Sequence, residues 1–196
     1  MDWKNKKVLI TGGAGMIGTE LCLKLIDLGA NIHVADIKNG LEFDLREYKT
    51  CKILTEGMDI VMHLAGIKGN PQNSKEQPTS YMIPMLQFNT NMIRAAQECN
   101  IKRFLYTSSV AVEFPEFDYY PAWAKITGEK LIEAMRIEYP QGVKFCIVRP
   151  ANVYGKFDDF IEPEKRAMVV TSLISKAIKE PEIEIWGDGS TIRDFI

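Results

Sequence analysis

The sequence has few of the residues that build metal centres and disulfide frameworks. Its four cysteines lie far apart with no C-x-x-C pair, and it has only two histidines. This spacing disfavours a zinc site or a disulfide-stapled fold, and it fits a reducing, cytoplasmic setting. His33 and His63 each lie in an apolar run. They are therefore expected to be buried strand residues rather than metal ligands.

Long apolar runs and an excess of one charge are also missing. No apolar run approaches the length of a transmembrane helix, and the basic start MDWKNKKVLI meets glycines too soon for a signal peptide. The 24 lysines and arginines nearly balance the 26 aspartates and glutamates, and they are scattered along the chain. The sequence therefore predicts neither a membrane segment nor a nucleic-acid partner.

What the sequence does have is an alternation of apolar runs and segments of helical period, in 196 residues that are 46% hydrophobic. Strands are expected at residues 7–12, 31–37, 59–66, 103–109 and 143–150, with shorter ones at 41–43 and 183–186. Helices are expected at residues 16–28, 46–56, 82–98, 122–138 and 166–179, and a polar loop with two prolines at 67–80. This alternation predicts an α/β fold with a doubly wound parallel sheet of the Rossmann type.

Three glycines follow the first expected strand, in the stretch VLITGGAGMIG. Gly12 would allow a tight turn, Gly15 would let the backbone approach a pyrophosphate, and Gly18 would let the helix pack on the strand. The unpaired N–H groups at the start of that helix would bind the pyrophosphate. The glycines together with the flanking strand and helix therefore predict a dinucleotide site.

Asp36 ends the second expected strand, about 20 residues beyond the glycines. Its carboxylate is expected to accept hydrogen bonds from the adenosine ribose and to repel a 2′-phosphate, which favours NAD over NADP. Lys38 argues the other way, because a cation at this position would tolerate the 2′-phosphate of NADP. A structural turn followed by a surface aspartate is the alternative interpretation of this stretch.

Several stretches together carry a resemblance to a known family. They are the TGGAGMIG turn, FDLRE, DIVMHLAG, NTNMIRAAQECNIKRFLYTSS, AKITGEKL, RPANVYG and WGDGSTIRDF. With them the chain resembles the extended short-chain dehydrogenases/reductases, the NAD-dependent epimerases and dehydratases of nucleotide sugars, over essentially its whole length. The stretch YGKFDDFIEPEKRAMVV most resembles the reductase-epimerases that make GDP-fucose-like sugars.

The resemblance implies roles for individual residues. Beyond the three glycines and Asp36, the residues implied to bind the cofactor are Met16, Ile17, Ile37, Asp44, Leu45, Leu64, Ala65, Gly66, Lys125 and Pro150. Those implied to contact the substrate are Ser108, Ser109, Asn152 and Arg193. The implied catalytic residues are Ser109, Tyr120 and Lys125.

The implied chemistry needs a base that takes a hydroxyl proton, and the family's base is a tyrosine whose pKa a lysine lowers. A tyrosine four residues before the lysine would share its helical face, but Pro121 stands four before Lys125. Tyr120, one residue earlier, is about 100° of rotation away from that direction. A proline at the first helical position would place Tyr120 at or before the N-cap, outside regular helix. Tyr120 is therefore the candidate base, with a surface or packing role as the alternative.

Two further positions depart from the family. Met85 stands where many relatives carry an asparagine, and it is expected to be a core residue. Glu113 stands where many relatives carry a tyrosine, and the sequence leaves open whether it contacts substrate or is merely exposed. The stretch SVAVE also lacks the Asp-Glu pair of the dehydratases, which disfavours dehydration.

The sequence therefore predicts an NAD-dependent epimerase, or epimerase/reductase, that acts on a nucleotide-activated sugar through transient hydride transfer. A non-catalytic protein that binds NAD or a nucleotide sugar is the alternative, and a reductase of another small carbonyl compound is a third. Residues 1–150 are predicted to form the NAD-binding domain, and residues 151–196 the start of a small substrate-binding domain in an apparently truncated chain. The resemblance also implies a homodimer through helices 82–98 and 122–138.

Overall fold

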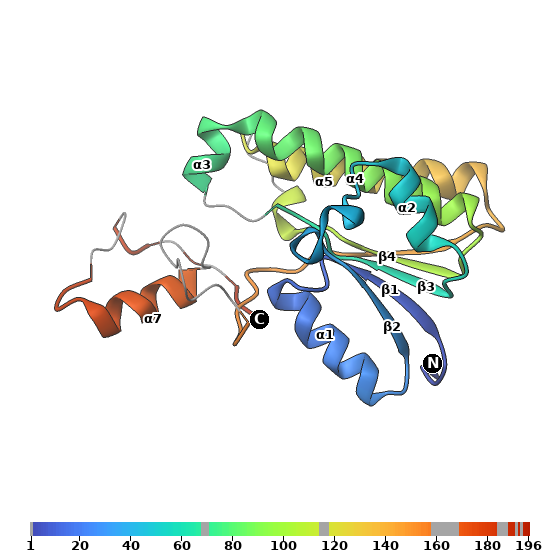
Figure 1. Cartoon of the computed structure of the whole chain (residues 1–196). Helices are drawn as coiled ribbons and strands as arrows, with labels where there is room; N and C mark the ends of the chain where they lie inside the picture. The colour runs from blue at the N-terminus through green and yellow to red at the C-terminus, as the bar shows by residue number, and fades with distance from the viewer. Residues whose placement is uncertain are drawn as a thin grey trace.

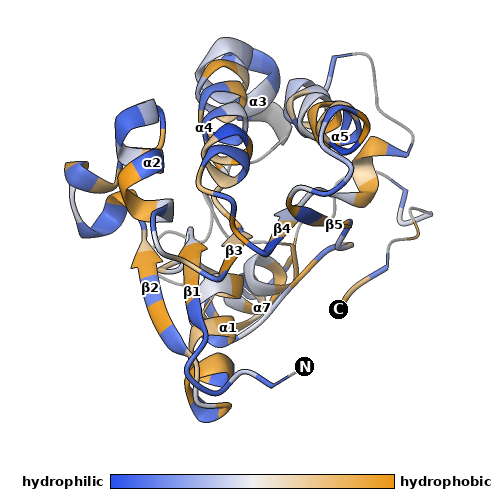
Figure 2. Cartoon of the chain, turned by 90° about the vertical axis from the view of Figure 1, so that its right-hand side faces the viewer, coloured by the Kyte–Doolittle hydropathy of each residue, from blue (hydrophilic) through white to orange (hydrophobic). Residues whose placement is uncertain are grey.

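A computed structural model of the chain describes residues 2–67, 71–113, 118–157, 169–183, 188–190, 192 and 194–196. Its strands are β1 (Lys7–Thr11), β2 (Asn31–Ala35), β3 (Ile60–His63), β4 (Arg103–Thr107) and β5 (Lys144–Val148). They form one sheet in the order β2-β1-β3-β4-β5, in which all neighbours are parallel (Figures 1 and 2). The order reverses between β1 and β3, and ligands of such sheets bind at this point, outside the carboxyl ends of the strands.

Helices cover both faces of the sheet, as Figures 1 and 2 show. On one face lies α1 (Met16–Asp27), and on the other lie α2 (Tyr48–Thr55), α4 (Pro78–Glu98) and α5 (Tyr120–Glu138). The short helix α3 (Pro71–Glu76) precedes α4, and α7 (Val169–Lys179) lies apart from the sheet (Figure 1). The predicted doubly wound α/β fold is confirmed.

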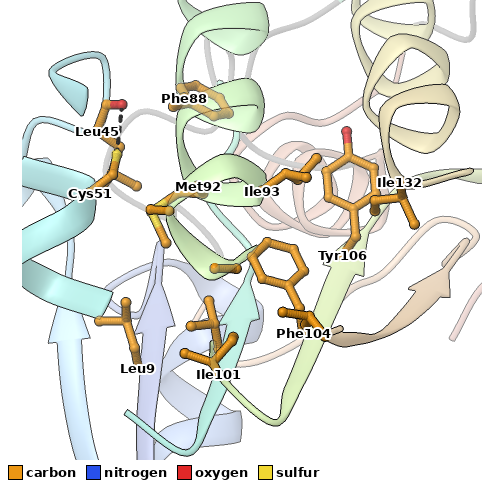
Figure 3. Close-up of a cluster of buried hydrophobic side chains, with 14 of the residues drawn as sticks. Leu9, Leu45, Cys51, Phe88, Met92, Ile93, Ile101, Phe104, Tyr106 and Ile132 are labelled. Atoms are coloured by element: carbon orange, nitrogen blue, oxygen red, sulfur yellow. Dashed lines mark hydrogen bonds between the residues drawn. The ribbon is translucent and has the colours of Figure 1, made fainter. Parts of the chain in front are cut away.

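The strands send alternate side chains into two cores, because successive residues of a strand point to opposite faces. The core beneath α2, α4 and α5 includes Leu9, Val61, Met92, Ile93, Phe104 and Ile132 (Figure 3). The core beneath α1 includes Val8, Ile10, Cys22, Leu25, Ile60 and Met62. The sheet is thus apolar on both sides, as the continuous apolar runs in the sequence predicted.

The prediction of a loop over residues 67–80 is wrong for residues 71–76 and 78–80, which are helical, while residues 68–70 lie outside the described residues. Helix α3 begins at Pro71, and α4 begins at Pro78, four residues earlier than expected. Proline suits the first position of a helix, since its missing N–H would have no helical partner there and its φ is already close to the helical value. The two prolines that indicated a loop therefore mark the starts of two helices.

The prediction of a strand at residues 41–43 is also wrong. This stretch forms a 3-10 helix, η2 (Leu41–Phe43), just after η1 (Ile37–Asn39). In the described sheet β2 is therefore an edge strand, and His33 on it is exposed rather than buried. His63 on the central β3 is buried as predicted. Residues 184–186 of the last expected strand, and 166–168 of the last expected helix, lie outside the described residues.

Candidate active site

The glycine-rich turn joins the carboxyl end of β1 to the start of α1. Gly12 has φ +69°, a region that suits glycine, and a Cβ there would lie 2.8 Å from the Ala65 nitrogen. A Cβ on Gly18 would overlap the carbonyl oxygen of Gly12, so only glycine lets the helix start this close to the turn. Gly15 is the N-cap of α1, where no side chain bonds the first helical amides. These amides suit an anion such as a pyrophosphate.

A pocket of about 310 Å³ opens where the strand order reverses. It is lined by Gly12, Ala35, Asp36, Ile37, Phe43, Asp44, Leu45, Arg46, Ala65, Gly66, Ile67, Ser80, Pro84 and Phe88. The predicted cofactor residues among them are Gly12, Asp36, Ile37, Asp44, Leu45, Ala65 and Gly66. Aromatic and apolar walls with a few polar groups suit a nucleoside.

Asp36 closes this pocket at the end of β2. Its Oδ2 accepts a hydrogen bond from the Ala14 amide (3.0 Å) and its Oδ1 accepts one from the Lys38 amide (3.0 Å). The carboxylate is thereby fixed against the glycine turn, and each oxygen keeps a lone pair for a ligand. The Lys38 ammonium donates to the Ala14 carbonyl (3.5 Å), and Lys38 does not line the pocket.

The segment from Asp44 to Arg46 forms another wall of the pocket. Hydrogen bonds from the Arg46 guanidinium lower the pKa of the Asp44 carboxyl. The Leu45 carbonyl accepts hydrogen bonds from the Cys51 thiol (3.1 Å; Figure 3) and from Nδ2 of Asn91 (3.1 Å). Cys51 and Asn91 escaped the sequence analysis. Asn91 lies 46 residues from Leu45 along the chain, and no local pattern indicates such a contact.

Ser109 follows the carboxyl end of β4, and Lys125 reaches this strand end from α5. The Ser109 Oγ accepts a hydrogen bond from the Ala111 amide (3.2 Å), so its own hydrogen can point toward a substrate oxygen. The Lys125 ammonium donates to the Thr107 carbonyl (2.6 Å). Burial lowers the pKa of Lys125 to about 8. The structure thus brings these two predicted catalytic residues to the same strand end.

Tyr120 is the first residue of α5, and Tyr119 is the N-cap. The prediction that Tyr120 lies outside regular helix is therefore wrong, because Pro121 takes the second helical position instead of the first. At 3.6 residues per turn, the side chains of Tyr120 and Lys125 leave the helix about 140° apart. Tyr120 is 36% exposed. Its role as the base stays a prediction.

The stretches predicted to contact substrate meet after β5. Asn152 forms a parallel bridge with Phe195, and its Nδ2 donates to the Asp194 carbonyl (3.0 Å). Residues 152–154 and 194–196 therefore lie side by side, although Asn152 and Asp194 are 42 residues apart in the sequence. Arg193 lies outside the described residues. The carbonyl of Pro150 accepts a hydrogen bond from the Val110 amide (3.2 Å), which joins this region to the Ser109 segment.

An ion pair that the sequence analysis missed joins the end of β5 to α5. Arg149 donates through Nε and Nη2 to both oxygens of the buried Glu129 (2.9 and 2.6 Å), and these bonds lower the pKa of Glu129. Glu113 is exposed and its carboxylate lies 3.5 Å from the same guanidinium. Ser108, expected to contact substrate, is only 4% exposed, and its contact with a substrate stays a prediction.

The other predicted cofactor residues lie outside the pocket. Met16 and Ile17 line a separate hollow of about 560 Å³ between α1 and residues 153–157. Neither hollow is lined by Gly15, Gly18, Leu64, Lys125 or Pro150. Met85 is 3% exposed, which confirms its expected place in the core. The pocket therefore collects the residues expected around adenosine, while the remaining ones lie in the glycine turn and α1, after β3 and β5, and in α5.

Over the part of the chain that the structure describes, no helix has the length and apolar character to cross a membrane. Across those same residues, no three histidine, cysteine, aspartate or glutamate side chains gather as ligands of one metal ion.

Comparisons with known proteins agree with this geometry. The sequence model of the NAD dependent epimerase/dehydratase family matches residues 8–196. The chain is 27% identical to GDP-L-colitose synthase of Yersinia pseudotuberculosis, over 97% of this chain and 68% of that protein. It is 28% identical to GDP-L-fucose synthase 1 of Arabidopsis thaliana, over 100% of this chain and 66% of that protein.

A solved structure shares the fold. It is the UDP-N-acetylglucosamine 4-epimerase from Methanobrevibacter ruminantium M1 in complex with UDP-N-acetylmuramic acid. The TM-score is 0.82 at 25% identity, over 98% of this chain and 69% of that one. The chain thus spans about two thirds of the length of these relatives.

Proposed function

Since the chain belongs to the NAD dependent epimerase/dehydratase family, we propose that it is an NAD-dependent enzyme that epimerises, or epimerises and reduces, a nucleotide-activated sugar. The family's description confirms the predicted type of cofactor. The names of GDP-L-colitose synthase and GDP-L-fucose synthase 1 support the substrate class. The observation that carries the proposal is the glycine turn at the end of β1, beside a pocket that Asp36 closes.

The residues at the strand ends fit NAD. A side chain on Gly12 or Gly18 would fill the turn, and the uncapped amides of α1 suit the pyrophosphate. Asp36 would bind the adenosine ribose, and Asp44 with Leu45 would border the adenine. Lys125 would bind the ribose next to the nicotinamide. When bound, NAD supplies a two-electron acceptor and donor beside the sugar.

The chain's own groups would handle the sugar hydroxyl and its proton. Ser109 would donate its hydroxyl hydrogen to the reacting oxygen and hold it in place. The Lys125 ammonium would stabilise negative charge on a neighbouring oxygen, which lowers the pKa of the group that bears it. Tyr120 is the proposed acceptor of the hydroxyl proton.

The remaining parts of the proposal concern the substrate side and the assembly. Residues 1–150 would form the NAD-binding domain, and residues 151–196 would begin the substrate-binding region, with Ser108, Asn152 and Arg193 as substrate residues. A homodimer would form through α4 and α5, which pack side by side on one face of the sheet (Figure 2). Sedimentation of the purified chain tests this part of the proposal, because a dimer should have twice the 22.2 kDa mass of one chain.

The test of the enzyme proposal is turnover of a panel of GDP-, UDP- and dTDP-sugars, followed by NMR of the sugar products. Conversion of one member, dependent on NAD, is expected. No conversion across the panel, with intact NAD binding, would favour the non-catalytic alternative. Family membership favours the enzyme, and the observation that favours the alternative is Pro121 one helical turn before Lys125.

A further inference from the structure

Three buried polar side chains form a hydrogen-bonded relay behind the nucleoside pocket. Thr11 ends β1, His63 ends β3 and Asn89 lies in α4, and none is more than 1% exposed. Oγ1 of Thr11 lies 2.7 Å from Nδ1 of His63, and Nε2 of His63 lies 3.0 Å from Oδ1 of Asn89. The Ala65 amide donates to the same Thr11 oxygen (3.3 Å). The relay therefore crosses two strands and a helix.

The relay connects the walls of the pocket from behind. Each relay residue lies one or two positions from a residue that lines the pocket, and these lining residues are Gly12, Ala65 and Phe88. The ring of His63 also packs edge-on against Phe88, with ring centres 5.9 Å apart. A shift of any relay member would thus move a wall of the pocket with it.

The donors and acceptors of the relay fit one arrangement of protons. Oδ1 of Asn89 can only accept, so Nε2 of His63 carries the proton and Nδ1 is an acceptor. The Thr11 hydroxyl then donates to Nδ1, and its oxygen accepts from the Ala65 amide. Burial, and secondly the charge of Lys125, lower the pKa of His63 to about 3. The imidazole therefore stays neutral and this order of bonds persists at physiological pH.

We propose that His63, acting with Thr11 and Asn89, is a positioning residue that holds the three walls of the nucleoside pocket at the separation that binds adenosine. This inference rests on the proposed function, because it presumes that the pocket takes the adenosine part of NAD. The backbone ladder already pairs Thr11 of β1 with His63 of β3. The apolar contacts between α4 and these strands are non-directional, whereas the hydrogen bond between His63 and Asn89 is a directional contact that fixes how α4 lies over them. Breaking the relay would loosen the pocket before it unfolds the sheet.

The test compares two buried threonines. Thr11→Val removes the relay hydroxyl at nearly constant shape, and Thr11→Ser keeps it. Thr55→Val is the matched control, since Thr55 is also 0% exposed and donates to the Cys51 carbonyl (2.7 Å), and neither of these two residues lines the pocket. Calorimetric titration with ADP is expected to show binding weakened about tenfold by Thr11→Val and less than about threefold by Thr11→Ser. Thr55→Val should lower the thermal midpoint and leave ADP affinity unchanged.

Equal ADP affinity of Thr11→Val and Thr55→Val would overturn the proposal. Should Thr11→Val not fold, Asn89→Leu breaks the other end of the relay instead. Its ADP affinity is then compared with that of Thr55→Val, and equal affinities would likewise overturn the proposal. Imidazole ¹⁵N spectra test the relay without any nucleotide, with the exposed His33 as the second signal. They should show His63 protonated at Nε2 alone from about pH 5 to about pH 9, and a titrating or Nδ1-protonated His63 would contradict the relay. An unaltered chain that binds neither ADP nor NAD would contradict the proposed function itself.

Discussion

Pro121 and Lys125 lie one turn apart on the same side of α5, and the proline ring carries no hydroxyl. The Lys125 ammonium reaches the Thr107 carbonyl at the end of β4, so this side of the helix faces the site. Tyr120 begins the helix about 140° away around its axis. Lys125 is therefore in place at the site. A tyrosine on the same side of α5 would stand at position 121, but Pro121 has no group that can exchange a proton.

Tyr120→Phe is expected to reduce turnover about 100-fold, because general-base catalysis typically contributes that much or more. NAD affinity should not change, since the phenol oxygen has no part in holding the cofactor. Steady-state kinetics and calorimetry on the same preparation provide both values. Pro121→Tyr is the counterpart, and it should bring no gain. If turnover is unchanged in Tyr120→Phe and rises at least about tenfold in Pro121→Tyr, then Tyr120 is not the base.

Lys125 gives a signature in the pH dependence of stability. Its pKa of about 8 in the folded chain lies below its usual 10.5, so the unfolded chain binds more protons between these values. The free energy of unfolding should therefore rise with pH from about 8 to 10.5, and this gain should be absent below pH 8. The total rise in the free energy of unfolding that comes from Lys125 is about 3 kcal/mol at most. Urea unfolding of the chain and of Lys125→Met measures it, and equal pH slopes in both would contradict the burial of this ammonium.

Gly18→Ala tests the close contact between α1 and the glycine turn. The added methyl would overlap the Gly12 carbonyl, so the helix must move, at a cost of about 1–3 kcal/mol. NAD affinity should fall together with the thermal midpoint. Gly155→Ala is the control, because a Cβ at Gly155 meets nothing within 4 Å. Full NAD affinity in Gly18→Ala would show that the placement of this helix does not govern binding.

Asp36→Asn addresses the choice between NAD and NADP. The unaltered chain should bind NAD more tightly, because a 2′-phosphate would meet the Asp36 carboxylate. The amide removes this repulsion while keeping an acceptor for the Ala14 amide, so the preference should shrink about tenfold. Asp44→Asn removes another carboxylate of the pocket and should affect both cofactors alike. An unchanged ratio of affinities in Asp36→Asn would mean that another group selects the cofactor.

The sheet and the glycine turn were predictable because their signals are local. Apolar runs such as 60–62 indicate a strand that is buried on both faces, and glycine spacing directly reflects backbone approach. The stretch LEF at residues 41–43 is too short for periodicity to separate a strand from a helical turn. A proline such as Pro71 or Pro78 can start a helix or interrupt a chain in a loop, so composition alone misjudged both positions.

The parts of the site that escaped the sequence depend on contacts between distant segments. Asn91 bonds to Leu45 and Arg46, and Arg149 bonds to Glu129, across 20 to 46 residues of chain. His63 was correctly expected to be buried, but a residue's burial does not indicate its hydrogen-bond partners. Such pairings are set by the packing of α4 and α5 on the sheet, which becomes visible only once the elements are in place.

The most direct measurement is calorimetric titration of the purified chain with NAD, with circular dichroism of the same sample to show that it is folded. The glycine turn, the uncapped start of α1 and Asp36 predict a saturable heat with one NAD bound per chain, and competition by ADP for the same site. A folded chain that gives no heat with millimolar NAD would contradict the assignment of this strand end as a cofactor site.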